Sequence, residues 1–107
     1  MRWYAIRTVY LVGSKSDGAN VFEERAVCFS ASSWEEAHRK AGVESQEYAG
    51  ANGFEAHAEQ VGYEQDGEPL LDGYEVWSEF FESKLDLDDF YRARYLAFLY
   101  TPEPSEP

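Results

Sequence analysis

The sequence predicts an α+β fold, with an antiparallel four-stranded sheet and two helices packed on one face of the sheet. Two observations predict it. Four segments alternate along the chain or are rich in β-branched and aromatic residues, and two others have helical spacing after a capping residue. The order β-β-α-β-β-α is typical of helices that cover one side of an antiparallel sheet. With 107 residues, the chain fits one domain over residues 1–100 and a flexible Pro-rich tail over residues 101–107.

The first two strands are expected at residues 3–12 and 21–30, where β-branched and aromatic side chains are frequent. A polar loop rich in Gly, Ser and Asn at residues 13–20 separates them and predicts an antiparallel hairpin. Alternation in the second strand places two sets of side chains on opposite faces: Val21, Glu23, Arg25, Val27 and Phe29 on one, and Phe22, Glu24, Ala26 and Cys28 on the other.

A helix is expected to start after Ser33, because Ser33 and Glu36 have the spacing of a capping box. Its inner stripe should face the sheet, and its glycine-rich end lies at residues 50–53. Spacings of three and four residues define that stripe as Trp34, Ala37, Ala41, Ser45 and Tyr48.

The second half repeats the pattern, with a third strand at residues 54–65 and a fourth at residues 74–82. The pairs Asp66-Gly67 and Asp72-Gly73, with Pro69 between them, predict turns. Asp86 should cap a last helix. The expected inner side of that helix comprises Leu87, Phe90, Tyr91, Arg94 and Phe98.

Negative charge is concentrated in one stretch of the chain. The net charge is −12, and residues 54–89 hold twelve acids against Lys84 alone, whereas residues 1–53 carry −1 and residues 90–107 are neutral. This surface disfavours nucleic acid and acidic membranes as partners and favours a basic protein. The single cysteine and the absence of a signal-like apolar run indicate a cytoplasmic protein, without a membrane span.

Four short segments, read in order, resemble a known bacterial family. They are Trp3-Tyr4-Ala5-Ile6-Arg7, Phe22-Glu23-Glu24-Arg25-Ala26-Val27, Ser33-Trp34-Glu35-Glu36-Ala37 and Gly73-Tyr74-Glu75-Val76-Trp77-Ser78. Their order and spacing over residues 3–95 resemble the domain of unknown function 4288. The resemblance implies a small bacterial protein of no established activity, so it assigns no functional residues.

Glu55, His57 and Glu59 alternate along the expected third strand and therefore share a face. A histidine with two carboxylates has the donor types of a divalent-metal site, but a solvated strand face has the same spacing, and no metal or cofactor is expected. Cys28 could form a Cys–His pair with His38 or His57. A buried, unreactive thiol is the preferred interpretation of Cys28.

Arg7 is expected to pair across the hairpin with Glu23 or Glu24. The pair is either an exposed contact worth at most about 1 kcal/mol or a buried one used in binding. The acids between Glu75 and Asp89 would form a catalytic pair only in a cleft that shifts their pKa values, and a solvated face is preferred.

The main functional prediction is a surface on which aromatic anchors interleave with acids. It describes a non-enzymatic protein-interaction domain, concretely an immunity or inhibitor protein that covers the positive site of a basic toxin. The alternative is a self-associating structural domain, a homodimer, and solubility alone is a further explanation of the acids. The partner-binding residues are predicted as Glu64, Tyr74, Glu75, Trp77, Glu79, Glu82, Asp86, Asp88 and Asp89.

Overall fold

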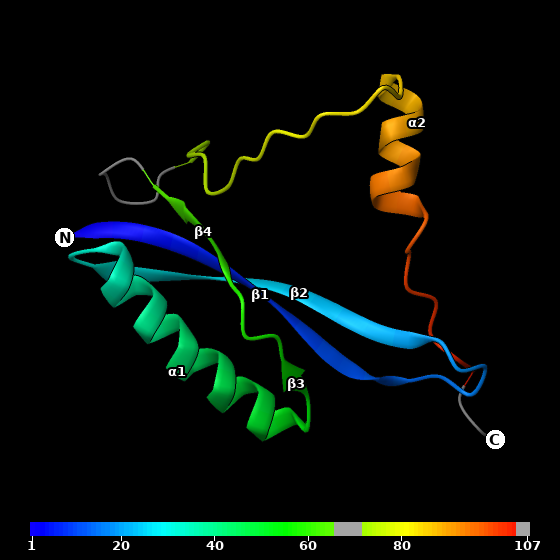
Figure 1. Cartoon of the computed structure of the whole chain (residues 1–107), viewed down its shortest axis with the longest axis horizontal. Helices are drawn as coiled ribbons and strands as arrows, with labels where there is room; N and C mark the ends of the chain where they lie inside the picture. Colours follow the sequence, from blue (N-terminus) through cyan, green and yellow to red (C-terminus); the bar gives the residue numbers. More distant parts are fainter. Residues whose placement is uncertain (66–71, 105–107) are drawn as a thin grey trace.

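The computed structural model describes residues 1–65 and 72–104 and has an antiparallel four-stranded sheet with two helices (Figure 1). The predicted α+β class, the sheet and the order of elements are confirmed. The elements are β1 (Arg2–Ser14), β2 (Asn20–Ala31), α1 (Trp34–Asn52), β3 (Glu55–Ala56), β4 (Val61–Glu64), α2 (Leu87–Tyr91) and the π-helical turn η1 (Arg92–Leu96).

The β1–β2 hairpin forms most of the sheet. Its antiparallel register runs from Arg2 opposite Ala31 to Ser14 opposite Asn20, with one irregularity beside Leu11. Alternation along β2 is as predicted from Val21 to Phe29, because the odd-numbered residues there are half-buried and the even-numbered ones are exposed. The half-buried face is the one that α1 covers.

β1 is the central strand, with β2 on one edge and both β3 and β4 on the other. The single strand predicted at residues 54–65 is therefore wrong in detail, since the chain leaves the sheet between Ala56 and Val61. The His57 N–H still donates to the Val9 carbonyl at 2.8 Å, but the Glu59 N–H donates to His57 Nδ1 at 3.0 Å and turns the chain. One edge of β1 thus binds two short strands in succession.

The predicted strand at residues 74–82 is not a strand. Instead, the segment lies over the face of the sheet opposite α1, where Trp77 and Glu79 contact Arg7. The turn at Asp72-Gly73 is present, with Gly73 at φ 81°, whereas the turns expected at Asp66-Gly67 and Pro69 lie outside the described residues.

α1 lies along the sheet because its inner stripe is made of small side chains. Ser33 caps the helix by accepting the Glu36 N–H at 3.2 Å, and Gly53 ends it at φ 71°. The buried residues of the helix are Ala37, Ala41, Ser45 and Ala49, and the aromatic ends of the predicted stripe, Trp34 and Tyr48, are only partly covered. Small side chains allow the helix backbone to approach Tyr4 and Ile6, which form the core together with Ala31.

The C-terminal helical segment, residues 87–100, does not lie on the face of the sheet that α1 covers. The prediction of two helices on one face is wrong in this respect. Glu23 and Arg25 of β2 contact α1, so Phe22 and Glu24 point to the opposite face. Those two residues line a cavity together with side chains of η1, and Figure 1 shows α2 standing away from α1 on the other side of the hairpin. The periodicity predicted a helix but not which face it would meet.

A helix must be long and apolar to cross a membrane. Among residues 1–65 and 72–104, no helix combines the length and apolar character needed to cross a bilayer.

Candidate protein-interaction site

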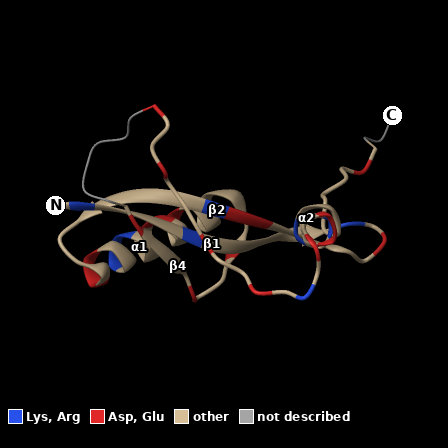
Figure 2. Cartoon of the chain, turned by 90° about the horizontal axis from the view of Figure 1, so that it is seen from above, with Lys and Arg blue, Asp and Glu red and all other residues tan. Residues whose placement is uncertain are grey.

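The predicted partner-binding residues follow the chain over three consecutive parts rather than one strand face. Glu64 ends β4, Asp86, Asp88 and Asp89 begin α2, and the remaining five lie on the irregular segment between them. Figure 2 shows acidic residues spread along this path instead of gathered in one block. The charge concentration of the sequence is therefore divided among several local settings.

Trp77 and Glu79 fasten the irregular segment to the sheet through Arg7. The Arg7 guanidinium carbon lies 5.1 Å from the centroid of the Trp77 ring, and Arg7 Nη1 lies 2.9 Å from Glu79 Oε1. The Trp77 indole N–H donates to the same Glu79 oxygen at 2.8 Å. About four-fifths of the Arg7 and Glu79 side chains is covered, so this pair contributes more than an exposed one would.

The partner of Arg7 differs from the one that the sequence predicted. Glu23 points to the α1 face, and the residue directly opposite Arg7 in the hairpin is Ala26. Arg7 is on the other face, where Glu79 arrives from a distant part of the chain. The predicted pairing with Glu23 or Glu24 is wrong because it considered only the neighbouring strand.

Tyr63 provides a second attachment point for the same segment. Its hydroxyl donates to the Glu75 carboxylate, and its ring centroid lies 6.0 Å from that of Trp77. Tyr63 stands opposite Ala5 in the sheet, on the face where Arg7 also projects. Trp77 therefore packs between an arginine of β1 and a tyrosine of β4.

The acids at the start of α2 form their contacts within the same helical segment. The Asp86 carboxylate caps the helix by accepting the Asp89 N–H at 2.9 Å, as predicted. Asp88 forms an ion pair with Arg92 one turn later, at 2.9 Å. Negative side chains at this end also suit the helix dipole.

Apart from Asp86, which caps α2, the predicted acids fall into two groups according to whether they form an ion pair. Glu64 pairs with Arg2, as Glu79 does with Arg7 and Asp88 with Arg92. Glu75, Glu82 and Asp89 are exposed to solvent. The second group is the part of the acidic stretch whose charge is best placed to meet a partner.

Sequence reasoning missed a polar network between β2 and α1. Arg25 donates to Glu44 at 2.8 Å and to the Tyr10 hydroxyl at 3.2 Å, and its guanidinium lies 3.7 Å from the centroid of the Tyr48 ring. Tyr48 in turn donates to Glu23 at 2.6 Å. The hydrogen bonds that Arg25 donates to Glu44 raise the pKa of Arg25, and the one that Tyr48 donates to Glu23 raises the pKa of Tyr48. The inward-facing Arg25 of the alternating strand was the signal that an acid had to lie opposite.

Gln65 is a second residue that the sequence did not single out. It is buried, its N–H donates to the Trp3 carbonyl at 2.8 Å, and its amide nitrogen lies 3.5 Å from the Val76 carbonyl. Its Oε1 has no hydrogen-bond partner in the described part of the chain. Glutamine is usually exposed, so composition alone gave no reason to place it inside.

Neither small candidate site is assembled by the fold. Glu55, His57 and Glu59 are all exposed, and the turn at His57 removes the strand alternation that would align them. Within residues 1–65 and 72–104, no group of three or more His, Cys, Asp or Glu side chains is arranged to hold a metal. Cys28 is exposed on the face opposite α1, so the prediction of a buried thiol is wrong, because α1 covers only the other face of β2.

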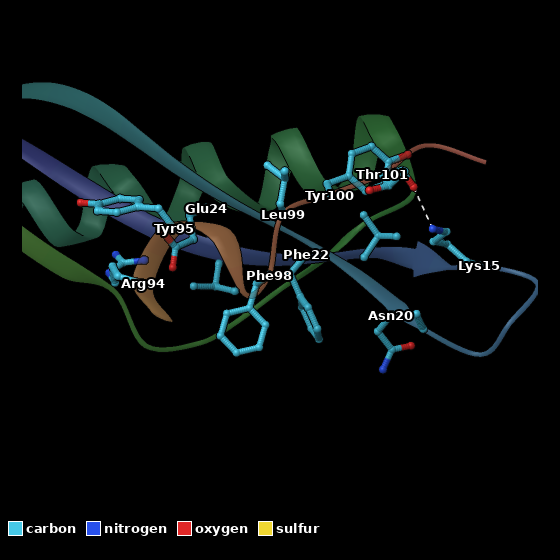
Figure 3. Close-up of a pocket in the computed structure, with 13 residues that line it drawn as sticks. Lys15, Asn20, Phe22, Glu24, Arg94, Tyr95, Phe98, Leu99, Tyr100 and Thr101 are labelled. Carbon is cyan, nitrogen blue, oxygen red and sulfur yellow. Dashed lines mark hydrogen bonds between the residues drawn. The ribbon is translucent and has the colours of Figure 1, made fainter. Parts of the chain in front are cut away.

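A cavity of about 710 Å³ lies between the hairpin and the C-terminal segment (Figure 3). Phe22 and Phe98 both line it, and its charged lining residues are Lys15, Glu24 and Arg94. Lys15 Nζ donates to the Thr101 carbonyl at 2.8 Å, and Glu103 accepts from the N–H and the hydroxyl of Ser16, both at 2.7 Å. The first residues of the Pro-rich tail thus contact the loop between β1 and β2.

Comparison of the chain with protein-family models, with curated proteins and with solved structures gave no match. The resemblance to the domain of unknown function 4288 consequently stays a prediction that depends on the four segments quoted above.

Proposed function

We propose that the chain is a non-enzymatic protein-interaction domain of the bacterial cytoplasm, whose residues 72–89 bind a basic protein. An immunity or inhibitor protein directed at a basic toxin is the concrete form of this proposal. The observation that carries it is the setting of Phe80, whose side chain is 99% exposed between Glu79 and the exposed acid Glu82.

The chemistry of the segment suits recognition of a cationic surface. Val76 and Phe81 of the same segment are about half exposed, so apolar anchors neighbour the exposed carboxylates of Glu75 and Glu82 along the chain. Aromatic anchors supply most of the binding free energy at interfaces, whereas surrounding charges mainly raise the association rate and select the partner. A basic protein with an exposed apolar patch would satisfy both.

The anchoring contacts make this surface partly pre-organised. Trp77 and Glu79 hold the middle of the segment against Arg7, and Asp86 holds its end by capping α2. A segment that is ordered before binding loses less conformational entropy when the partner arrives.

The experiment is capture from a lysate of the source cell on the immobilised chain, after nuclease treatment, with proteins identified by mass spectrometry. Basic proteins should bind at about 0.1 M salt and be released at about 1 M, where charges are screened beyond roughly 3 Å. Purified candidates are then titrated to obtain the dissociation constant and its salt dependence.

The matched variants are Glu75→Gln with Glu82→Gln, and Glu35→Gln with Glu47→Gln on α1, which removes equal charge from other exposed positions. The first pair should weaken binding roughly tenfold, in line with the 0.2–1 kcal/mol typical of each exposed charge contact. Equal affinity for both double variants would refute the proposed surface, even if a basic partner is found.

A further inference from the structure

The C-terminal helical segment exposes more apolar side chain than a monomeric surface usually carries. Leu87 is 86% exposed and Phe98 is 89% exposed. Six large side chains, each more than half exposed, follow one another here: Leu87, Tyr91, Tyr95, Phe98, Leu99 and Tyr100. Together they present roughly 800 Å², since a large side chain contributes on the order of 100–200 Å².

This segment has little within its own chain to stabilise it. α2 and η1 have five residues each, and neither contains a buried residue. Isolated helices shorter than about 12–15 residues are marginal in water, because most helical stability comes from packing an apolar face. Phe90 and Arg94 contact Phe81, but this leaves the Tyr91–Tyr95 side open.

The hairpin carries a second open surface on the face opposite α1. Phe22 is 61% exposed there, and Ala26 and Cys28 are exposed further along the same strand. Phe22 and Phe98 line the same cavity, so the two open surfaces adjoin there (Figure 3).

The dimensions of the chain agree with incomplete packing. The radius of gyration of the Cα atoms is 16.7 Å, whereas a compact domain of this length has about 13 Å. The helical segment therefore stands out from the α1-covered part of the fold, as Figure 1 shows.

The charge distribution selects a second copy as the occupant of these surfaces. Residues 90–107 are neutral and residues 1–53 carry only −1, although the whole chain carries −12. The segment 87–100 holds Asp88 and Asp89 but also Arg92 and Arg94, so it is neutral overall. Contact through it and the hairpin keeps the rest of the acidic stretch of each copy outside the interface and limits repulsion between like-charged chains. The exposed apolar area also matches the roughly 800 Å² per partner that a standard interface buries.

We propose that the chain forms a twofold-symmetric homodimer, in which the helical segment 87–100 of each copy covers the Phe22 face of the other copy's hairpin. Such a pairing is isologous, so each copy both donates a helix and receives one. It stabilises the short helix by the packing that a single chain does not supply. It also leaves Glu75 and Glu82 available to a different partner.

Sedimentation equilibrium and light scattering test this proposal directly. At about 100 µM, where even micromolar affinity populates the complex, the mass should be twice that of one chain. Raising the salt concentration should leave the dimer intact or strengthen it, since apolar contact drives it against a net repulsion. A monomeric mass at that concentration overturns the proposal.

Phe98→Asp should weaken dimerisation about 30-fold or more, as expected for an aromatic anchor. Phe80→Asp is the matched control, because it changes an equally exposed phenylalanine of the acidic segment, and it should leave the dimer intact. Equal dimerisation of both variants overturns the assignment of the surface.

Hydrogen exchange on the unaltered chain provides a measurement that needs no variant. Amides of residues 87–98 should exchange more slowly at about 100 µM than at about 1 µM, while those of α1 should not change. Exchange of the helical segment that does not depend on concentration also contradicts the dimer.

Discussion

The indole of Trp34 lies directly against the Cα of Gly62, so the first residue of α1 packs on the backbone of β4. A Cβ atom at Gly62 would stand 2.3 Å from Trp34 Cζ3 and 3.0 Å from Ile6 Cδ1. The Trp34 ring also meets Tyr4 edge-on, with 4.7 Å between centroids. Gly62 thus permits a close approach of α1 and β4 beside the core residues Tyr4 and Ile6.

Gly62→Ala should destabilise the fold by about 1–3 kcal/mol, because the added methyl group has no free space and overpacking displaces the indole. Urea unfolding followed by circular dichroism measures the change. Gly42→Ala is the control. Within residues 1–65 and 72–104, no atom lies within 4 Å of its Cβ position in the middle of α1, so alanine should stabilise the protein by about 0.5–1 kcal/mol. A neutral Gly62→Ala would contradict the close packing.

Arg25→Lys should destabilise the protein by about 1–2 kcal/mol, although the charge is retained. Lysine cannot donate to Glu44 and the Tyr10 hydroxyl while stacking on Tyr48, as the planar guanidinium does. A double-mutant cycle of Arg25→Ala and Glu44→Ala, read by urea unfolding, measures their coupling. Additive losses would mean that the hydrogen bonds between them contribute nothing net.

Glu36 should make stability depend on pH below the ordinary carboxylate range. The hydrogen bonds from Ser32 hold its pKa below the usual 4.5, so the charged form is favoured in the folded state. The resulting stabilisation is complete above the unfolded-state pKa and is lost as pH falls through the lower folded value.

Glu36→Gln should therefore flatten the change in urea midpoint between about pH 5.5 and pH 3 relative to the parent chain. The neighbouring Glu35→Gln removes an equal charge from the same helical turn and is the control. Titration of the Glu36 side-chain carboxyl by NMR gives its pKa directly, and a value at or above 4.5 would contradict the contact with Ser32.

Arg7→Gln should release the irregular segment from the sheet without unfolding α1. The variant loses both the ion pair with Glu79 and the contact with the Trp77 ring, which together should raise the open population roughly tenfold. Limited proteolysis by chymotrypsin at Phe80 and Phe81 reports this opening. Arg39→Gln, at an exposed position of α1, should leave the cleavage rate unchanged.

Much of the first half of the fold could be predicted from residue pattern. Alternation in β2 predicted its two faces, and the spacing of Ser33 and Glu36 predicted the start of α1, because strand period and helix capping are local properties. The alternating pattern of the second half was misleading. The alternation of Tyr74, Val76, Ser78 and Phe80 with Glu75, Trp77, Glu79 and Phe81 predicted a strand. The segment is irregular instead, and its Trp77 contacts Arg7 and Tyr63.

In the candidate site, too, local features were predicted from the sequence and contacts between distant residues were not. The sequence predicted a surface on which aromatic anchors interleave with acids, and contacts of Trp77 and Glu79 with Arg7 hold part of this segment on the sheet. It did not predict that Arg7 and Arg2 would neutralise Glu79 and Glu64, which are more than fifty residues away. Charge counts along a chain do not include partners that only folding brings near.

By itself, the sequence determined the α+β class, the hairpin, the capped helix and the position of the acidic stretch, since each depends on residues close together in the chain. Only the tertiary structure decided that β3 and β4 share one edge of β1, that the C-terminal helical segment lies opposite α1, and that Glu75, Glu82 and Asp89 stay exposed. Those outcomes depend on competition between distant segments for the same strand edge, sheet face or arginine, and local periodicity contains no information about that competition.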